Sequence, residues 1–114
     1  MHLTPGQVVL TKMIPYPDGT LVQYVARPFL VVGISETHIE TLVISSLQGK
    51  QHKALMRSNY VLKRYKPPLL RSSFVKLDSL QRTAIANLSD LRLASNGIKI
   101  DENELEIILE HIVY

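Results

Sequence analysis

The stretch Arg27-Pro28-Phe-Leu-Val-Val-Gly-Ile-Ser35 decides how the rest of the chain is interpreted. Residues 29–34 are almost continuously apolar, which predicts a central strand buried on both faces. Arg27 stands at the start of this run, and its guanidinium group keeps its charge in proteins. We therefore expect a permanent cation at the end of a buried strand.

Short strands and turns are predicted on both sides of the central strand. Residues 6–13 form a first strand and residues 15–19 a turn, because proline fixes φ and Asp-Gly tolerates the left-handed conformation. Residues 21–26 are expected to return as a second strand and complete a hairpin. Further strands are expected at His38–Ser46, around 59–62, and at 73–77 with a continuation towards Thr83.

The C-terminus carries a clear helix signal. Asp101 is the expected N-cap, and Glu104 follows three residues later, as in a capping box. Apolar residues then recur with helical spacing at 105, 108, 109 and 112, so that one apolar stripe runs along the helix. We expect a helix over about residues 101–113, packed on the strands.

Five or six short strands and one terminal helix predict a mainly β fold, a small and strongly bent barrel with the helix packed on it. The 114 residues have the size of one domain, so residues 1–114 are expected to form a single unit. There is no cysteine, which excludes disulfides and thiolate metal sites. Without a visible signal peptide or an apolar stretch of membrane-spanning length, a cytoplasmic protein with no membrane partner is expected.

Charge is distributed unevenly along the chain, whose formal net charge is +3. No acidic residue occurs between Glu40 and Asp78, although eight of the thirteen Lys and Arg residues lie there. A one-sided basic surface attracts anions and supplies phosphate contacts. Most such runs are ordinary solvated faces, but the missing counter-charges favour an anion-binding surface.

Four segments, in this order, resemble the PemK/MazF family of toxin endoribonucleases. They are residues 6–10 (Gly-Gln-Val-Val-Leu), 27–32 (Arg-Pro-Phe-Leu-Val-Val), 44–46 (Ile-Ser-Ser) and 70–78 (Leu-Arg-Ser-Ser-Phe-Val-Lys-Leu-Asp). With the terminal helix they cover nearly the whole chain. The resemblance implies an SH3-like barrel, usually a homodimer, that cuts single-stranded RNA without a metal or other cofactor. It also implies a cognate antitoxin protein whose flexible, often acidic tail covers the RNA groove.

The resemblance further implies two catalytic residues. The family's catalytic arginine corresponds to Arg27, and its catalytic hydroxyl, normally a threonine, corresponds to Ser45. Better-studied members carry a glutamate five residues before the arginine, where this chain has Val22. The substitution removes a plausible proton acceptor.

The chemistry of RNA cleavage gives both residues a task. A base must take the proton of the 2′-OH, the crowded phosphorane must be neutralised, and the leaving 5′-oxygen must gain a proton. Arg27 suits the second task because a guanidinium can bind two phosphate oxygens at once. Ser45 can donate to a phosphate oxygen or hold the 2′-oxygen in line. The structural alternatives are a surface arginine beside a strand and a serine that caps a turn.

Other side chains are candidates for proton transfer and RNA binding. His52 lies near two lysines whose charges favour its neutral, basic form, unless it is simply exposed and idle. The four histidines show no metal-ligand spacing, so no metal site is predicted. In RNA complexes, cationic side chains contact the backbone phosphates while bases stack on aromatic rings. Tyr60 and Tyr65 could equally be residues of the core and of the barrel rim. The RNA-binding candidates are Lys50, Lys53, Arg57, Tyr60, Arg64, Tyr65 and Ser73.

Three functions compete. The leading hypothesis is a metal-independent endoribonuclease of the toxin type. The second is a non-catalytic RNA- or protein-binding module on the same barrel, which Val22 favours. The third, poisoning of a DNA topoisomerase as CcdB-type toxins do, relies on C-terminal side chains that this chain needs for its own core.

Overall fold

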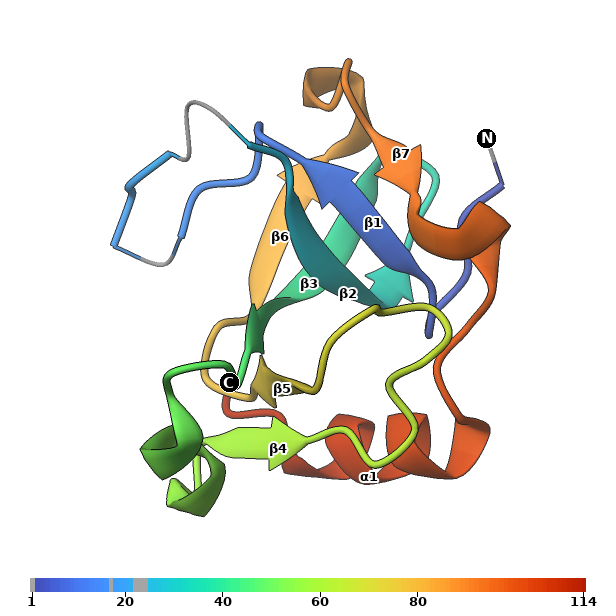
Figure 1. Cartoon of the computed structure of the whole chain (residues 1–114). Helices are drawn as coiled ribbons and strands as arrows, with labels where there is room; N and C mark the ends of the chain where they lie inside the picture. Colours follow the sequence, from blue (N-terminus) through green and yellow to red (C-terminus); the bar gives the residue numbers. More distant parts are fainter. Residues whose placement is uncertain (1, 17, 22–24) are drawn as a thin grey trace.

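The computed structural model describes residues 2–16, 18–21 and 25–114. Within these residues the chain is mainly β, with seven strands in one open antiparallel sheet and one C-terminal α-helix (Figure 1). The expected mainly β fold with a terminal helix is confirmed. The elements are β1 (Val8–Thr11), β2 (Arg27–Ile34), β3 (His38–Ser46), η1 (Gln51–Leu55), β4 (Asn59–Val61), β5 (Ser73–Lys76), β6 (Gln81–Ala84), η2 (Ile85–Asn87), β7 (Arg92–Leu93), η3 (Ala94–Gly97) and α1 (Glu102–His111), where η denotes a 3₁₀ helix.

The strand β2 is central, as the sequence predicts. The sheet order is β4-β5-β3-β2-β1-β7, and β6 pairs with β3 outside this path. Successive side chains of β2 point to opposite faces of the sheet. Leu30 accordingly packs in one apolar cluster, whereas Phe29 and Val31 pack in another. Burial on both faces explains why the run is almost continuously apolar.

The expected hairpin between residues 6–13 and 21–26 is not formed by the described residues. Residues 22–24 lie outside the described part of the chain, and Leu21, Val25 and Ala26 belong to no strand. The partner of β1 is β2 itself, with Val9 opposite Phe29 and Thr11 opposite Arg27. β7 pairs with the other edge of β1, so both edges of β1 have a strand partner.

The strand expected from residue 73 towards Thr83 is divided in two. β5 pairs with the end of β3, and β6 pairs with its beginning. Between them, Ser79 Oγ accepts a hydrogen bond from Val43 N at 2.8 Å and donates to Lys76 O at 2.6 Å. This buried hydroxyl takes the place of a backbone partner where the ladder is interrupted.

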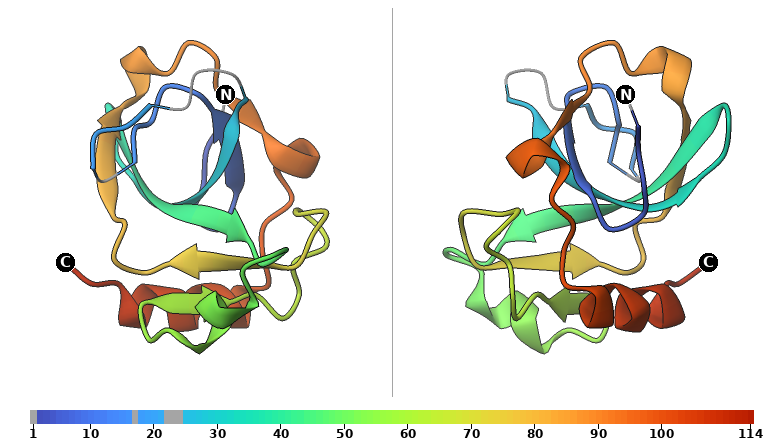
Figure 2. Two further views of the ribbon diagram at one scale, coloured as in Figure 1. Left: turned by 60° about the vertical axis from the view of Figure 1, so that its left-hand side comes forward. Right: turned by 90° about the vertical axis from the view of Figure 1, so that its right-hand side faces the viewer.

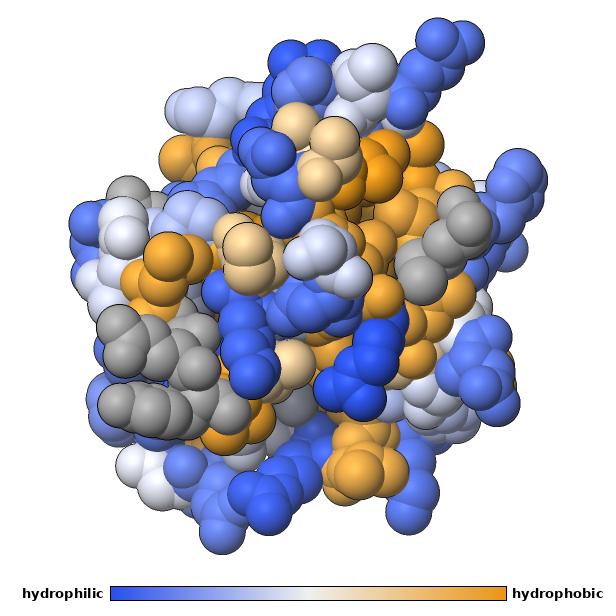
Figure 3. All heavy atoms as spheres, turned by 90° about the horizontal axis from the view of Figure 1, so that it is seen from above, coloured by the Kyte–Doolittle hydropathy of each residue, from blue (hydrophilic) through white to orange (hydrophobic). Residues whose placement is uncertain are grey.

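Two apolar clusters fill the molecule. One includes Leu42 and Val75 of the sheet and Ile108 of α1, and the other includes Val9 and Phe29. The sheet curls strongly, and α1 lies beneath β5 and beside β4 (Figure 2). Seen from above, apolar side chains gather between polar ones, so apolar surface reaches solvent at this end (Figure 3).

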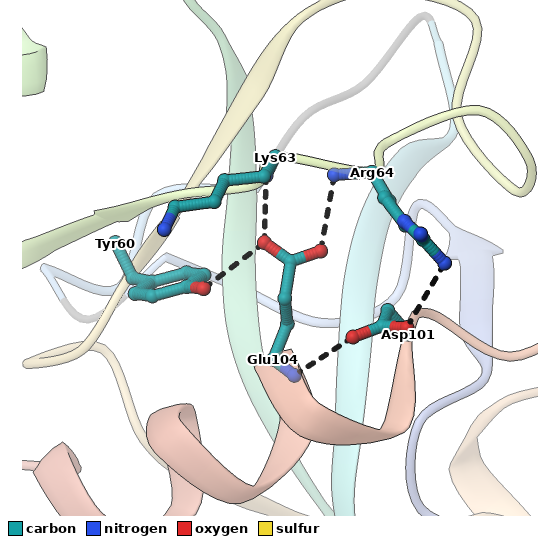
Figure 4. Close-up of polar contacts among 5 residues, drawn as sticks. All are labelled: Tyr60, Lys63, Arg64, Asp101 and Glu104. Carbon is teal, nitrogen blue, oxygen red and sulfur yellow. Dashed lines mark hydrogen bonds and ion pairs between the residues drawn. The ribbon is translucent and has the colours of Figure 1, made fainter.

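The terminal helix begins as predicted but uses its second acidic residue differently. Asp101 Oδ2 accepts from Glu104 N at 3.3 Å, which confirms the N-cap. The carboxylate of Glu104 accepts from the backbone N–H groups of Lys63 at 2.6 Å and Arg64 at 3.1 Å, and from the Tyr60 hydroxyl at 3.0 Å (Figure 4). Glu104 therefore fastens α1 to the segment after β4 instead of completing a capping box.

The apolar stripe of α1 is narrower than expected. Ile108 and Ile112 are buried, and Leu105 packs half-buried against the same cluster. Leu109 is 39% exposed. Adjacent residues lie about 100° apart around a helix, and the inward face is centred on Glu104 and Ile108, so Leu109 falls at its margin.

Candidate functional site

A cavity of about 910 Å³ lies where the sheet divides. The ladder between β2 and β3 ends at the pair Phe29–Val43. β3 continues through Ile44–Ser46, which pair with β5 on the other edge. Among the described residues, the edge of Ile44–Ser46 that faces β2 has no strand partner, and these residues line the cavity. An occupant can thus meet backbone groups as well as side chains.

Arg27 and Ser45 line this cavity together. Arg27 is the exposed first residue of β2, and its backbone is held opposite Thr11 of β1. Phe29–Val43 is the last pair of this ladder, and Arg27 and Ser45 each lie two residues beyond it, where the two strands separate around the cavity. Steps of two residues keep both side chains on the same face. The structure therefore brings together the cation and the hydroxyl that the sequence singles out.

Lys50 joins this pair by approaching the serine. Its Nζ donates to Ser45 Oγ at 3.3 Å, and it also lines the cavity. The approach depends on the turn after β3, in which Lys50 N donates to Leu47 O at 2.8 Å and Gly49 has a φ of 72°. Glycine adopts this left-handed conformation without steric cost. Lys50, a candidate RNA-binding residue from the sequence, therefore also orients the Ser45 hydroxyl.

The hydroxyls of Ser46 and Ser73 are engaged with the backbone. Ser46 Oγ accepts from Gln48 N at 3.1 Å, and Ser73 Oγ donates to Arg71 O at 2.8 Å. Both residues line the cavity. β3 ends at Ser46, where the chain turns. Of the three hydroxyls, that of Ser45 contacts a charged side chain.

The cavity is cationic. Its lining holds four cationic and two acidic side chains, a formal net charge of +2: Arg27, Lys50, Arg71 and Lys76 against Asp18 and Asp78. In the described part of the chain the one ion pair joins Arg64 to Asp101, neither of which lines the cavity. Four cations without an ion-pair partner attract an anionic ligand.

Arg71 and Lys76 are site residues that the sequence analysis did not select. Both belong to the basic stretch, and both fall in the segment of residues 70–78 that carries the family resemblance. Lys76 lies on β5, and the pairing of β5 with the end of β3 that bears Ser45 is what places it at the cavity. That pairing is a long-range contact, which the local sequence does not specify.

The two carboxylates of the cavity differ in their surroundings. Asp18 Oδ1 accepts from Thr20 N at 2.8 Å. This backbone hydrogen bond is the main reason why the pKa of Asp18 lies below its usual value. Asp78 follows β5, is exposed and lines the same cavity. Asp18 is thus ionised and committed to its own turn, which leaves Asp78 as the carboxylate available to an occupant.

Six candidates from the sequence do not line the cavity, and three of these lie on η1 or just after it. His52 and Lys53 lie on η1, and Arg57 lies in the turn that follows it. The side chain of Asn59 donates to Lys53 O at 3.0 Å, which ties η1 to β4. The exposed His52 therefore stands apart from Arg27 and Ser45.

Tyr60, Arg64 and Tyr65 belong to the region around α1. Burial, followed by the hydrogen bond to Glu104, raises the pKa of Tyr60 to about 12. Tyr65 packs half-buried against the apolar cluster that includes Ile108. Arg64 Nη1 lies 3.6 Å from Asp101 Oδ1. The alternative that Tyr60 is a packing residue fits this geometry better than base stacking.

The described residues contain neither the position of the family's glutamate nor a metal-binding group or a membrane-spanning helix. Val22, the position where the family carries a glutamate, lies outside the described residues. Within the described ranges, no group of three or more His, Cys, Asp and Glu side chains could hold a metal ion. None of the helices in those ranges is long and apolar enough to cross a membrane.

No protein-family model matches the sequence, and a search of curated proteins gives no match.

Proposed function

We propose that the chain is an endoribonuclease of the PemK/MazF type that cleaves single-stranded RNA in the cavity. The observation that carries the proposal is the grouping of Arg27, Ser45 and Lys50 in one cavity lined by unpaired cations. A polyanion with exposed phosphates suits this charge, and single strands can follow a groove that a duplex is too wide to enter.

The reaction is an internal transesterification. The 2′-oxygen forms a bond to phosphorus while the bond between phosphorus and the 5′-oxygen breaks. A base takes the proton of the 2′-OH, and a proton is delivered to the leaving 5′-oxygen. The products are a 2′,3′-cyclic phosphate and a 5′-hydroxyl, so this cleavage step consumes no water and leaves no covalent bond to the protein.

Arg27 binds the reacting phosphate in this scheme. Its guanidinium neutralises the charge that accumulates on the non-bridging oxygens of the phosphorane. Lys50 holds the Ser45 hydroxyl by donating to its oxygen, so that the hydroxyl proton is directed away from the lysine and towards the phosphate. A well-aimed donor of this kind is worth about a hundredfold in rate.

Asp78 is the proton acceptor that we assign in place of the missing glutamate. It lines the cavity, and, whereas Asp18 accepts a hydrogen bond from Thr20 N, the carboxylate of Asp78 has no hydrogen-bond partner among the described residues. His52 lies outside the lining and is not needed for this role.

The same cationic lining supports a cognate antitoxin with an acidic tail as a partner, and the family resemblance supports a closed SH3-like barrel and a homodimer.

The test is incubation of the purified protein with a long single-stranded RNA in EDTA, followed by mapping of the new ends. The wild type is expected to cut at discrete positions and leave 5′-hydroxyl ends. Arg27→Ala should cut at least about a hundredfold more slowly. Arg92→Ala is the matched control, because Arg92 is exposed on β7 and does not line the cavity.

Two outcomes would redirect the assignment. Intact RNA that nevertheless binds to the folded wild type, and binds less to Arg27→Ala, would identify a non-catalytic RNA-binding module. Equal cleavage by the wild type and Arg27→Ala would remove the cavity from the reaction. Thermal unfolding of each variant shows whether a loss of activity is a loss of fold.

A further inference from the structure

A second, smaller hollow of about 550 Å³ adjoins the cavity. Ser46 and Arg71 line both, so the two spaces meet at the end of β3. Both volumes fall in the range of about 300–1,000 Å³ that is usual for small-ligand sites. Each is therefore large enough for part of an extended ligand that passes from one to the other.

The side chains of the smaller hollow suit a nucleobase. Its lining has two amides and two hydroxyls, one cation and no carboxylate: Gln48, Gln51, Ser46, Ser72 and Arg71, with Leu47. Amides and hydroxyls can pair with the hydrogen-bonding edges of an unstacked base. The single cation stands at the boundary with the cavity, where a phosphate linking two nucleotides would lie.

Arg71 is held in position at this boundary. Its Nη1 donates to Gln48 Oε1 at 2.8 Å, and its carbonyl accepts from the Ser73 hydroxyl at 2.8 Å. Gln48 is fixed in turn, because its backbone N donates to Ser46 Oγ at 3.1 Å. Leu47 N donates to Ser72 O at 3.0 Å, which joins the two chain segments that bear this pair.

Leu70, the residue before Arg71, offers an apolar surface to the cavity. Leu70 lines the cavity, and 82% of its surface is exposed. An exposed leucine beside an arginine can receive the face of one base while the guanidinium binds the adjoining phosphate. The two adjoining spaces thus present an apolar side chain (Leu70), a cation (Arg71) and the amides of Gln48 and Gln51.

We propose that the smaller hollow is a second nucleotide subsite, and that Arg71 binds the phosphate between the nucleotide in the cavity and the next one. Gln48 is a positioning residue that orients Arg71. This assignment rests on the proposed function, since it makes the substrate of the cavity an RNA segment that continues past Ser46.

The experiment measures affinity against length. Full-length wild-type protein is titrated into fluorescent 2′-fluoro RNA oligonucleotides of two to eight nucleotides, which lack the 2′-hydroxyl and are not cleaved. Affinity should rise about tenfold at the length that first reaches the smaller hollow. Arg71→Ala should abolish that step while binding of the shorter oligonucleotides changes little, and Arg92→Ala should keep it.

A second measurement separates the positioning role of Gln48 from a structural one. On cleavable RNA, Gln48→Ala should raise KM about threefold and leave kcat and the thermal midpoint unchanged, as expected for the loss of one exposed hydrogen bond. A smooth rise of affinity with length, or an Arg71→Ala effect that is equal at all lengths, would overturn the subsite but leave the nuclease standing. Failure of the wild type to bind any RNA would overturn both.

Discussion

Charged side chains have partners within the protein in the region around α1 but not in the cavity, as far as the described residues go. In the first, the buried carboxylate of Glu104 receives three hydrogen bonds, and the neighbouring Asp101 pairs with Arg64. In the cavity, no cation of the lining has an ion-pair partner among the described residues. The charges around α1 are thus paired within the protein, whereas the cations of the cavity have no ion-pair partner among the described residues.

This contrast separates stability from function. A buried charge without partners costs several kcal/mol, so Glu104 must keep its donors for the fold to persist. Exposed cations cost the fold little and can be removed with small effects on stability. Substitutions in the first region should therefore change unfolding, and those in the cavity should change RNA cleavage.

The largest expected effect is that of Glu104→Ala. It removes the acceptor of three hydrogen bonds, from the backbone N–H groups of Lys63 and Arg64 and from the Tyr60 hydroxyl, and should lower the free energy of unfolding by about 3 kcal/mol. Urea denaturation measures the change. Glu106→Ala is the matched control, because Glu106 is exposed on the same helix and should shift the midpoint little. Similar losses in both variants would show that Glu104 is not an anchor.

A smaller effect is expected within the cavity, where Ser45 and Ser46 can be compared. Ser45→Ala removes the hydroxyl that Lys50 contacts and should slow RNA cleavage by about a hundredfold. Ser46→Ala removes a turn contact to Gln48 N and should slow cleavage much less. Rates from a gel assay at saturating RNA decide the point. Equal rates in the two variants would take Ser45 out of the reaction.

The smallest effect is the pH dependence that Tyr60 confers. Burial and the hydrogen bond to Glu104 raise the pKa of Tyr60 to about 12 from its usual value of 10.0. The unfolded state therefore loses this proton first, and the contribution of Tyr60 to stability, present below pH 10, declines between pH 10 and 12. Denaturation of wild type and Tyr60→Phe across this range should show the wild type losing its advantage. A constant difference between them would mean that the pKa is not raised.

The sequence predicts those features that depend on local patterns. The apolar run of β2, the bounds of β3 and the Asp101 N-cap follow from periodicity and capping chemistry alone. The destination of the Glu104 carboxylate does not, because Lys63 and Arg64 lie about forty residues away along the chain. The amphipathic pattern of α1 is set by the local sequence, whereas the segment that α1 packs against is set by tertiary contacts.

The candidate site shows the same division. The family resemblance implies Arg27 and Ser45 as catalytic residues, and both line one cavity. Tyr60 was chosen for its basic neighbours in sequence, but its strand turns it towards α1. Proximity in a charge-rich segment does not specify a face, since alternate residues of a strand point in opposite directions. Lys50 was selected for its charge, and its contact with Ser45 arises from the turn at Gly49.

The salt dependence of RNA affinity tests most directly whether the cations of the cavity bind RNA phosphates. The affinity of the wild type for a 2′-fluoro RNA oligonucleotide would be measured at a series of KCl concentrations. If the four lining cations each contact a phosphate, a plot of log K against log salt should have a slope of about −3. Arg27→Ala should make it shallower by about 0.7, with Arg92→Ala unchanged. A slope near zero, or one that Arg27→Ala does not alter, would show that these cations do not hold RNA.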